Sequence, residues 1–207
     1  MIRIGVVDYD AGNLTSVKTA LKYLQADYLV SSEPEQLDQT DKLIFPGVGE
    51  ARAAMRNLKS RGLEQLLHSY FESGRQMLGI CLGSQIVLSR SEENDTPCLG
   101  LIPGTARRFS RGSGLKVPHM GWNRVHATAD SLLFKDIPDG SSFYFVHSYY
   151  PDPEEAAAVV ATCEYGVTFT AALKRGNLHA VQFHPEKSGK RGLQLLQNFL
   201  NYPGTGE

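Results

Sequence analysis

Strand-like and helix-like segments alternate along the first half of the chain, and this alternation restricts the possible folds more than any other feature. Short apolar or β-branched runs lie at residues 2–7, 28–30, 42–45 and 77–80. Helical patterns lie between them, at about residues 14–24, 51–59 and 63–73. Strands that alternate with helices form a parallel sheet covered on both faces, so the sequence predicts an α/β fold.

The second half of the chain is richer in strands. We expect strands at residues 122–125, 142–146, 157–163, 167–173 and 178–182, followed by a closing helix at 189–200. The turn Arg175-Gly176-Asn177 suits a hairpin, so antiparallel strands extend the parallel core. The chain contains no repeat, low-complexity segment or linker. We therefore predict that residues 1–207 form a single domain with a mixed, mostly parallel sheet flanked by helices.

Charge and cysteine content exclude several classes of protein. The 21 Lys and Arg residues nearly balance the 22 Asp and Glu residues, which gives no reason to expect a nucleic-acid or membrane partner. The three cysteines lack metal-ligand spacing, and an odd number favours a reducing compartment. The first residues do not resemble a secretory signal, and no run approaches the roughly 20 apolar residues of a spanning helix. We expect a cytoplasmic protein.

The stretch from residue 96 to residue 129 contains no acidic residue but five Arg and Lys residues. Such a run usually forms a solvated basic edge. The alternative is a docking face for an acidic partner or a phosphorylated ligand, and the sequence leaves this second interpretation open.

Cys81 lies in the sequence Gly79-Ile80-Cys81-Leu82-Gly83, where the buried strand at 77–80 is expected to meet a helix. This pattern is typical of a nucleophile elbow, with Cys in place of Ser. The flanking glycines allow neighbouring backbone to pack against a strained turn, and a helix N-terminus favours a thiolate. A cysteine in an apolar strand can also be a small buried hydrophobe, so the motif needs partners elsewhere in the chain.

The sequence His184-Pro185-Glu186 supplies those partners. Proline disfavours helical backbone at His184, so we expect an extended segment in which the side chains of His184 and Glu186 point to the same side. Glu186 can then orient the His184 imidazole, and the pattern predicts a Cys–His–Glu triad. Cys98 and Cys163 lack such neighbours and are expected to be structural.

An acyl-transfer site also needs donors for a developing oxyanion. The backbone N–H of Leu82, which follows the nucleophile, is one candidate. The Gly-rich turn Pro46-Gly47-Val48-Gly49 is expected to supply the second donor. Both segments follow parallel strands, and ligand sites lie at the carboxyl ends of such strands.

These motifs together resemble the class I, or triad, glutamine amidotransferases, which hydrolyse glutamine through a cysteine thioester. The resemblance rests on residues 79–85 and 182–186 and spans nearly the whole chain. Segments 8–14, 46–49, 117–123, 144–150 and 185–188 resemble the branch that contains the glutaminase subunits of imidazole glycerol phosphate synthase. Members of this branch pass ammonia to a (β/α)8 barrel cyclase subunit in histidine biosynthesis, so the resemblance implies a heterodimer.

The resemblance implies a flavodoxin-like fold and a role for several residues. Cys81, His184 and Glu186 would be catalytic. Residues implied in glutamine binding or oxyanion stabilisation are Gly47, Val48, Gly49, Leu82, Gln85, Ser148 and Tyr149. Residues implied at the partner interface are Asn13, Met120, Trp122 and Lys187. No metal and no organic cofactor is implied.

Some interpretations remain open. Met120 and Trp122 are as readily core residues as contact residues, and Lys187 can be a solvated surface lysine. His147 is either a buried hydrogen-bonded residue or a wall between the glutamine site and the partner. Departures from the family pattern at Asp10, Glu50-Ala51 and Ser84 leave room for a paralogue that feeds another synthase. A non-catalytic scaffold of the same fold and a free-standing cysteine hydrolase also stay open at this point.

Overall fold

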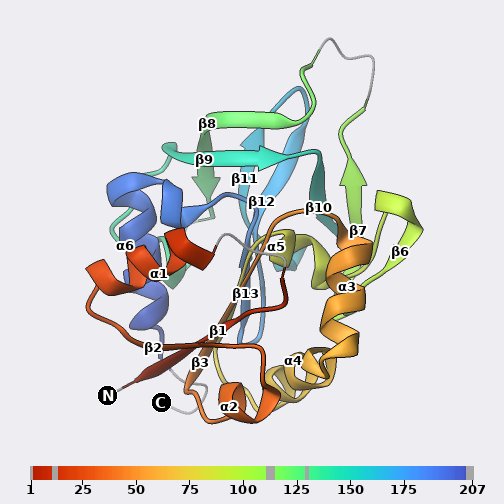
Figure 1. Ribbon diagram of the computed structural model, residues 1–207. Coiled ribbons are helices and arrows are strands. Elements are labelled where there is room, and N and C mark those ends of the chain that lie inside the picture. Colours follow the sequence, from red (N-terminus) through yellow and green to blue (C-terminus); the bar gives the residue numbers. More distant parts are fainter. Residues whose placement is uncertain (1, 11–13, 111–114, 129–130, 204–207) are drawn as a thin grey trace.

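The computed structural model describes residues 2–10, 14–110, 115–128 and 131–203. Two β-sheets and their covering helices make up the described part of the chain (Figure 1). The strands of the larger sheet are, in spatial order, β2 (Asp27–Ser31), β1 (Arg3–Val7), β3 (Lys42–Gly47), β4 (Met77–Cys81), β13 (Leu178–Val181), β12 (Thr168–Arg175), β11 (Val159–Glu164), β8 (His119–Ala127) and β9 (Ser141–His147).

The larger sheet has a parallel part and an antiparallel part. Neighbouring strands from β2 to β13 are parallel, and those from β13 to β9 are antiparallel. The turn at Gly176 joins β12 to β13 as an antiparallel hairpin, as predicted. The mixed α/β sheet predicted from the sequence is confirmed. Because β3, β4 and β13 are parallel neighbours, the segments that follow them emerge at one edge.

Helices cover both faces of this sheet (Figure 1). Helices α1 (Leu14–Tyr23) and α6 (Gly189–Leu200) bury Val17, Leu21 and Leu196 in one apolar cluster. Helices α2 (Pro34–Asp38), α3 (Ala51–Ser60) and α4 (Leu63–Glu72) pack into a second cluster on the other face. The short helix α5 (Leu82–Ile86) begins directly after β4 and is fully buried.

A smaller sheet was not predicted from the sequence. Its order is β10 (Tyr149–Pro153), β7 (Ile102–Arg108), β5 (Leu88–Ser91) and β6 (Thr96–Pro97). Pro103 and Gly104 interrupt the pattern of β7, and β6 has two residues, so these segments lack a strand signal.

Short 3₁₀ turns occupy Glu93–Asp95, Leu132–Phe134, Ala156–Ala158 and Pro185–Lys187. Because the turn at Ala156–Ala158 occupies its first positions, the strand expected from residue 157 begins two residues later, as β11. The strand expected from residue 122 begins three residues earlier, as β8.

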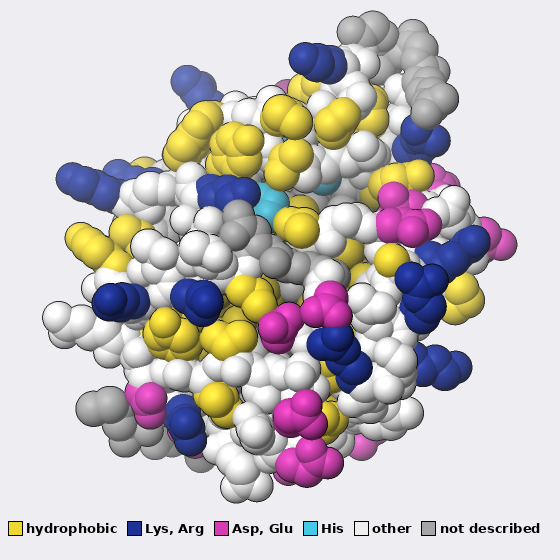
Figure 2. Space-filling view, viewed as in Figure 1, with side chains coloured by type: hydrophobic (Ala, Val, Ile, Leu, Met, Phe, Trp, Pro, Cys, Tyr) yellow, Lys and Arg dark blue, Asp and Glu magenta, His cyan; other side chains and the backbone are white. Residues whose placement is uncertain are grey.

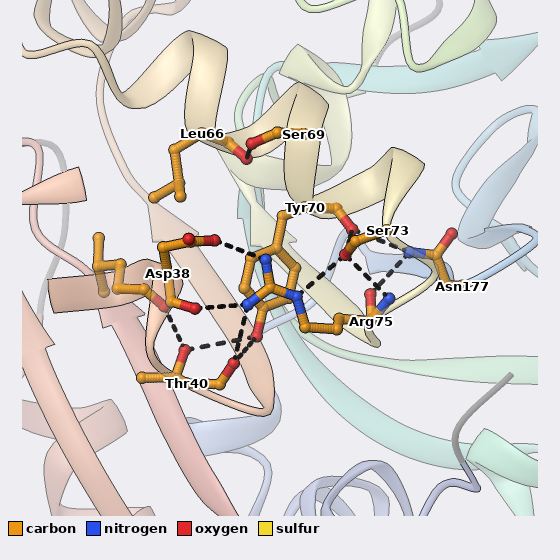
Figure 3. Close-up of polar contacts among 9 residues, drawn as sticks. Asp38, Thr40, Leu66, Ser69, Tyr70, Ser73, Arg75 and Asn177 are labelled. Atoms are coloured by element: carbon orange, nitrogen blue, oxygen red, sulfur yellow. Dashed lines mark hydrogen bonds and ion pairs between the residues drawn. The ribbon is translucent and has the colours of Figure 1, made fainter. Parts of the chain in front are cut away.

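Arg75 contacts residues from several segments at the end of the sheet where β3 and β4 begin (Figure 3). Its guanidinium donates to the Asp38 backbone oxygen at 2.6 Å and to that of Thr40 at 3.2 Å. It also pairs with the Asp38 carboxylate at 2.6 Å, and it stacks on the Tyr70 ring 3.8 Å from the ring centroid. Asn177, in the β12–β13 turn, donates to the Arg75 backbone oxygen at 2.7 Å. This cluster lies near the beginning of β4, whereas Cys81 is the last residue of that strand.

None of the helices in the described ranges is long and apolar enough to cross a membrane.

Candidate active site

Cys81 stands at the last position of β4 in a strained backbone conformation. Its φ is 54° and its ψ is −107°, a region that residues other than glycine rarely adopt. A Cβ on Gly83 would lie 2.5 Å from the Phe45 backbone oxygen, and a Cβ on Gly79 would lie 2.9 Å from the Phe45 ring. Both glycines are therefore required for the close packing of the turn, as the elbow pattern predicts.

His184 and Glu186 form the second part of the site. His184 Nδ1 lies 2.7 Å from Glu186 Oε1, and both side chains are almost completely buried. The expectation of an extended segment was wrong beyond His184, because Pro185 opens a 3₁₀ turn over residues 185–187. Lys187 N and Ser188 Oγ both donate to the His184 backbone oxygen, at 3.0 Å and 2.6 Å. The compact turn, and not an extended strand, brings the carboxylate to the imidazole.

The charge state of His184 follows from its neighbours. Burial lowers the pKa of His184, but the neighbouring Cys81 sulfur and the hydrogen bond to Glu186 outweigh burial and raise the pKa above its ordinary value. The other ring nitrogen, Nε2, is buried and has no hydrogen-bond partner of standard geometry among the described residues. It is therefore free to exchange a proton with the sulfur or with a bound substrate. The arrangement favours a positively charged imidazole beside the Cys81 sulfur, oriented by a carboxylate.

Two glutamine side chains connect the sulfur to the neighbouring loop. Gln182, which follows β13, places its Nε2 3.8 Å from Cys81 Sγ. Gln85, in α5, donates from its Nε2 to the Gln182 side-chain oxygen at 3.0 Å and to the Tyr149 backbone oxygen at 2.9 Å. Gln182 and Gln85 are thus fixed relative to the nucleophile and relative to the backbone at Tyr149.

A cavity of about 270 Å³ opens beside the sulfur. Its lining includes Cys81 and six of the seven residues expected to bind glutamine or the oxyanion. Its lining residues are Val48, Gly49, Cys81, Leu82, Gln85, Glu93, Pro118, Val146, His147, Ser148 and Tyr149. The seventh expected residue, Gly47, is not among the lining residues but is the register partner of Cys81 in the β3–β4 pair. The size of the cavity suits a small amino-acid substrate.

The Gly-rich turn lies beside the nucleophile, where an oxyanion donor is needed. Val48 and Leu82 both line the cavity next to Cys81, and Gly49 has a φ of +100°. A Cβ on Gly47 would lie 2.2 Å from the Tyr9 hydroxyl and 3.0 Å from the Leu82 Cβ, so this position admits only glycine. The use of the Val48 and Leu82 amides as oxyanion donors stays a prediction.

Sequence reasoning missed three residues of the site. Glu93 belongs to a charged run that resembles a solvated turn, yet it lines the cavity and accepts from the Ala51 backbone N–H at 2.7 Å. Tyr9 is buried against Gly47, and no described residue accepts or donates a hydrogen bond to its hydroxyl. Gln182 had one detectable signal, since it is a polar residue at the end of an apolar strand directly before the His184 motif.

The residues expected at a partner interface have different surroundings. Met120 and Trp122, on β8, are 61% and 58% exposed, so they are surface residues and not core. Figure 2 shows hydrophobic side chains gathered over β8 and β9 in the upper part of the molecule. Lys187 is half-buried next to Glu186. Asn13 lies outside the described residues. The participation of these four residues in an interface stays a prediction.

The basic stretch at residues 96–129 is only partly available to a partner. Arg107 pairs with Asp152 and lies 3.6 Å from Glu92, so acidic side chains from other segments offset its charge.

Cys98 and Cys163 are the structural cysteines that were expected. Burial raises the pKa of each thiol to about 12, which suppresses thiolate formation. The described residues contain no group of His, Cys, Asp and Glu suited to hold a metal.

Comparison with known proteins identifies the family. A family model described as glutamine amidotransferase class-I matches residues 6–202. The chain belongs to the class I glutamine amidotransferases. It is 47% identical over 205 residues to the imidazole glycerol phosphate synthase subunit HisH of Nitratidesulfovibrio vulgaris (strain DP4), with 96% of each chain covered. It is 46% identical over 211 residues to subunit HisH 1 of Pseudomonas aeruginosa, with 99% of each covered. The family and the branch predicted from the motifs are confirmed.

Solved structures confirm the fold of this amidotransferase. A chain in the structure of PurLQS from Thermotoga maritima superposes with a TM-score of 0.76 at 20% identity, covering 97% of this chain and 98% of that chain. A structure described as glutamine amidotransferase superposes with a TM-score of 0.72 at 22% identity, covering 96% and 97%. Relatives this distant show only that the class I amidotransferase fold is shared.

The departures from the family pattern fit locally into the amidotransferase fold. Asp10 has a φ of 58°, which glycine adopts more readily, and its carboxylate pairs with Arg61. Glu50 precedes α3, and its carboxylate accepts from Asn94. The Ser84 hydroxyl donates to the Cys81 backbone oxygen at 2.7 Å, inside the elbow. These contacts do not alter the triad.

Gly192 provides a test of how the His184 segment is positioned. Alanine is normally favoured over glycine inside a helix. A Cβ on Gly192, however, would lie 1.9 Å from the Pro185 backbone oxygen. We expect Gly192→Ala to displace the turn that carries Glu186, to lower the free energy of unfolding by about 1–3 kcal/mol and to reduce kcat for glutamine hydrolysis about tenfold or more.

The matched control is Arg191→Ala, because Arg191 is an exposed residue in the same turn of helix α6. Urea denaturation and steady-state kinetics of both variants provide the measurement. A Gly192→Ala variant with the kcat and stability of the control would contradict this account of the turn.

Proposed function

We propose that this chain is the glutaminase subunit of imidazole glycerol phosphate synthase, which hydrolyses glutamine to glutamate and ammonia. One observation carries the proposal: the strained Cys81 lines a cavity of about 270 Å³, and the raised pKa of the buried His184, which is paired with Glu186, depends in part on the Cys81 sulfur. The full-length similarity to subunits named HisH supports the choice of synthase. Three unpaired cysteines are consistent with action in the cytoplasm.

In the first chemical step the Cys81 thiolate attacks the side-chain carboxamide carbon of glutamine. The carbonyl oxygen becomes an oxyanion, which the backbone amides of Val48 and Leu82, two residues that line the cavity, would stabilise. His184 then gives its proton to the leaving nitrogen, the C–N bond breaks, and ammonia departs. The remaining acyl group forms a thioester with Cys81.

In the second step water attacks the thioester carbon while His184 accepts a proton from that water. The C–S bond breaks, glutamate leaves, and the thiolate is regenerated. Glu186 accepts a hydrogen bond from His184 Nδ1–H throughout, so it fixes the ring and stabilises the imidazolium. This division of roles assigns proton transfer to His184 and orientation to Glu186.

The rest of the cavity supplies groups for holding the amino-acid end of glutamine. The Glu93 carboxylate is the acidic group among the lining residues and suits a substrate ammonium group. The backbone at Ser148 and Tyr149 offers hydrogen-bonding groups on the same wall, and Gln85 secures it through the Tyr149 oxygen. These contacts would distinguish glutamine from amides that lack the amino-acid end.

The exposed apolar side chains of Met120 and Trp122 suit a protein partner. Large exposed apolar residues on one strand are typical of interaction surfaces. The partner expected from the branch is a (β/α)8 barrel cyclase subunit, which would receive the ammonia. Lys187 and Asn13 are the remaining candidate contacts, and the balanced charge of the chain gives no support to a nucleic-acid or membrane partner.

Replacing the nucleophile tests the chemistry directly. We expect Cys81→Ser to abolish glutamine hydrolysis while preserving the fold, because a hydroxyl is far less ionised than a thiol at neutral pH and is similar in volume. Glutamate release is measured in the complex with the cognate cyclase subunit. Cys163→Ser is the control and should retain activity, since Cys163 is not among the residues that line the cavity. Glutamate release by Cys81→Ser near the original rate would identify another nucleophile.

The two other triad residues should differ in importance. We expect His184→Ala to be as damaging as the loss of Cys81, because His184 carries the proton in both steps. Glu186→Gln should leave measurable activity, since an amide can still accept a hydrogen bond from Nδ1–H. Steady-state kinetics of the single and double variants provide the comparison, and non-additive losses are expected. Equal losses in His184→Ala and Glu186→Gln would show that the carboxylate does more than orient the ring.

The Gly-flanked peptide at Val48 predicts control by the partner. Glycines at positions 47 and 49 permit the peptide to reorient, and the loss of one oxyanion donor typically reduces the rate about 10²–10³-fold. We expect the isolated chain to be nearly inactive and the complex with cyclase and its nucleotide to be active. Glutamate release is measured for the chain alone, with cyclase, and with cyclase plus nucleotide. Equal rates in all three would rule out this control.

A further inference from the structure

Two buried histidines lie next to the candidate glutamine cavity and have no role in the chemistry described above. His119 and His147 are direct cross-strand neighbours in β8 and β9. They are 3% and 5% exposed, and His119 Nδ1 lies 2.9 Å from His147 Nε2. His147 lines the cavity, whereas His119 lies one residue before the exposed Met120.

The pair belongs to a longer chain of hydrogen bonds. At one end, His147 Nδ1 lies 2.8 Å from the Tyr149 backbone oxygen. At the other end, His119 Nε2 lies 3.3 Å from Asn123 Nδ2, and that amide nitrogen also donates to the Glu164 backbone oxygen at 2.8 Å. The chain therefore extends from the β8–β11 side of the sheet to the loop that forms the cavity wall.

Chemistry fixes the direction of every bond in this chain. A backbone oxygen only accepts, so His147 must carry its proton on Nδ1, and its Nε2 accepts when the ring is neutral. His119 must then donate from Nδ1 and accept on Nε2, which matches the Asn123 amide nitrogen as donor. One pair of tautomers thus satisfies all four ring nitrogens.

The surroundings keep both rings neutral. The rings of Phe109, Phe145 and Phe169 pack around His147, with centroid separations from 5.2 to 5.5 Å. Burial lowers the pKa of His119 to about 4. The pKa of His147 is lowered to about 3, chiefly by burial and to a lesser degree by the charges of His119 and His184, against the opposing effect of its hydrogen bond to the Tyr149 backbone oxygen. A charged His147 would oppose the imidazolium of His184, so a neutral ring is compatible with the triad.

The Tyr149 backbone oxygen receives two donors, one from His147 and one from Gln85. Gln85 in turn donates to Gln182, which contacts the Cys81 sulfur. We propose that His119 and His147 are positioning residues that hold the Ser148–Tyr149 wall of the glutamine cavity through fixed neutral tautomers. This inference rests on the proposed glutaminase function, because it assigns that wall to substrate binding.

Substitutions that remove one donor at a time test the proposal. In the complex with the cognate cyclase subunit, we expect His119→Leu to raise KM for glutamine about tenfold with a smaller change in kcat. His119→Asn should recover most of the loss, since its amide nitrogen can replace Nδ1 as donor to His147. The double variant His119→Leu/His147→Leu should be no worse than His147→Leu alone, because both substitutions break one chain.

The matched control is His179→Leu. His179 is also buried and neutral, but its Nε2 contacts Gln76 near the beginning of β13, away from the cavity. It should lose stability like the test variants while KM stays unchanged. A folded His119→Leu variant with wild-type KM, or a KM increase equal in His179→Leu, would overturn the proposal.

A second measurement does not depend on any variant folding. Imidazole ¹⁵N NMR of the full chain at pH 7 should show both His119 and His147 neutral and protonated on Nδ1. A ring protonated on Nε2, or on both nitrogens, would also overturn it. A wild-type complex that releases no glutamate contradicts the proposed function itself, whereas an active complex with an unchanged KM in His119→Leu contradicts only this inference.

Discussion

The strained backbone of Cys81 is the feature on which the site depends. A φ of 54° at a non-glycine residue costs on the order of 1–3 kcal/mol, so surrounding contacts must enforce it. Parallel pairing on both sides of β4 provides that enforcement, with Gly47 opposite Cys81 on one side and Val181 opposite Ile80 on the other. The Phe45 ring and backbone fill the space that side chains at Gly79 and Gly83 would need.

The same parallel pairing gathers the other groups of the site. Because β3, β4 and β13 all end at one edge, the turn at Val48, the elbow at Cys81 and the segment beginning at Gln182 emerge side by side. His184 is only two residues after Gln182 in this segment, which is enough to bring it to the Cys81 sulfur. Its backbone N–H donates to the Tyr144 oxygen at 2.9 Å, which ties this segment to β9. Candidate catalytic residues about a hundred positions apart in sequence are thus brought to the same edge of the sheet by the strand order.

The sequence was sufficient for the parts of the molecule that rest on local signals. Cys81, His184 and Glu186 could be singled out as a candidate triad because glycine spacing and a proline mark them. Glu93 could not, since its place on the cavity wall depends on a 3₁₀ turn and on the Ala51 amide, which is 42 residues away. The smaller sheet was missed because its strands are short and its pairing is non-local. The 3₁₀ turn at Pro185 was missed because proline restricts the residue before it but also begins helical turns well.

Three histidines near the cavity show why residue type alone cannot assign charge. His184 lies beside the Glu186 carboxylate and the Cys81 sulfur, and these two groups raise its pKa despite burial. His119 and His147 contact an amide, a carbonyl and each other, so burial lowers their pKa without opposition from an anion. One cationic ring therefore stands beside two neutral rings within one apolar environment. Each state suits its bonds: proton transfer requires a ring that gains and loses charge, whereas holding a carbonyl in place requires a donor whose tautomer never changes.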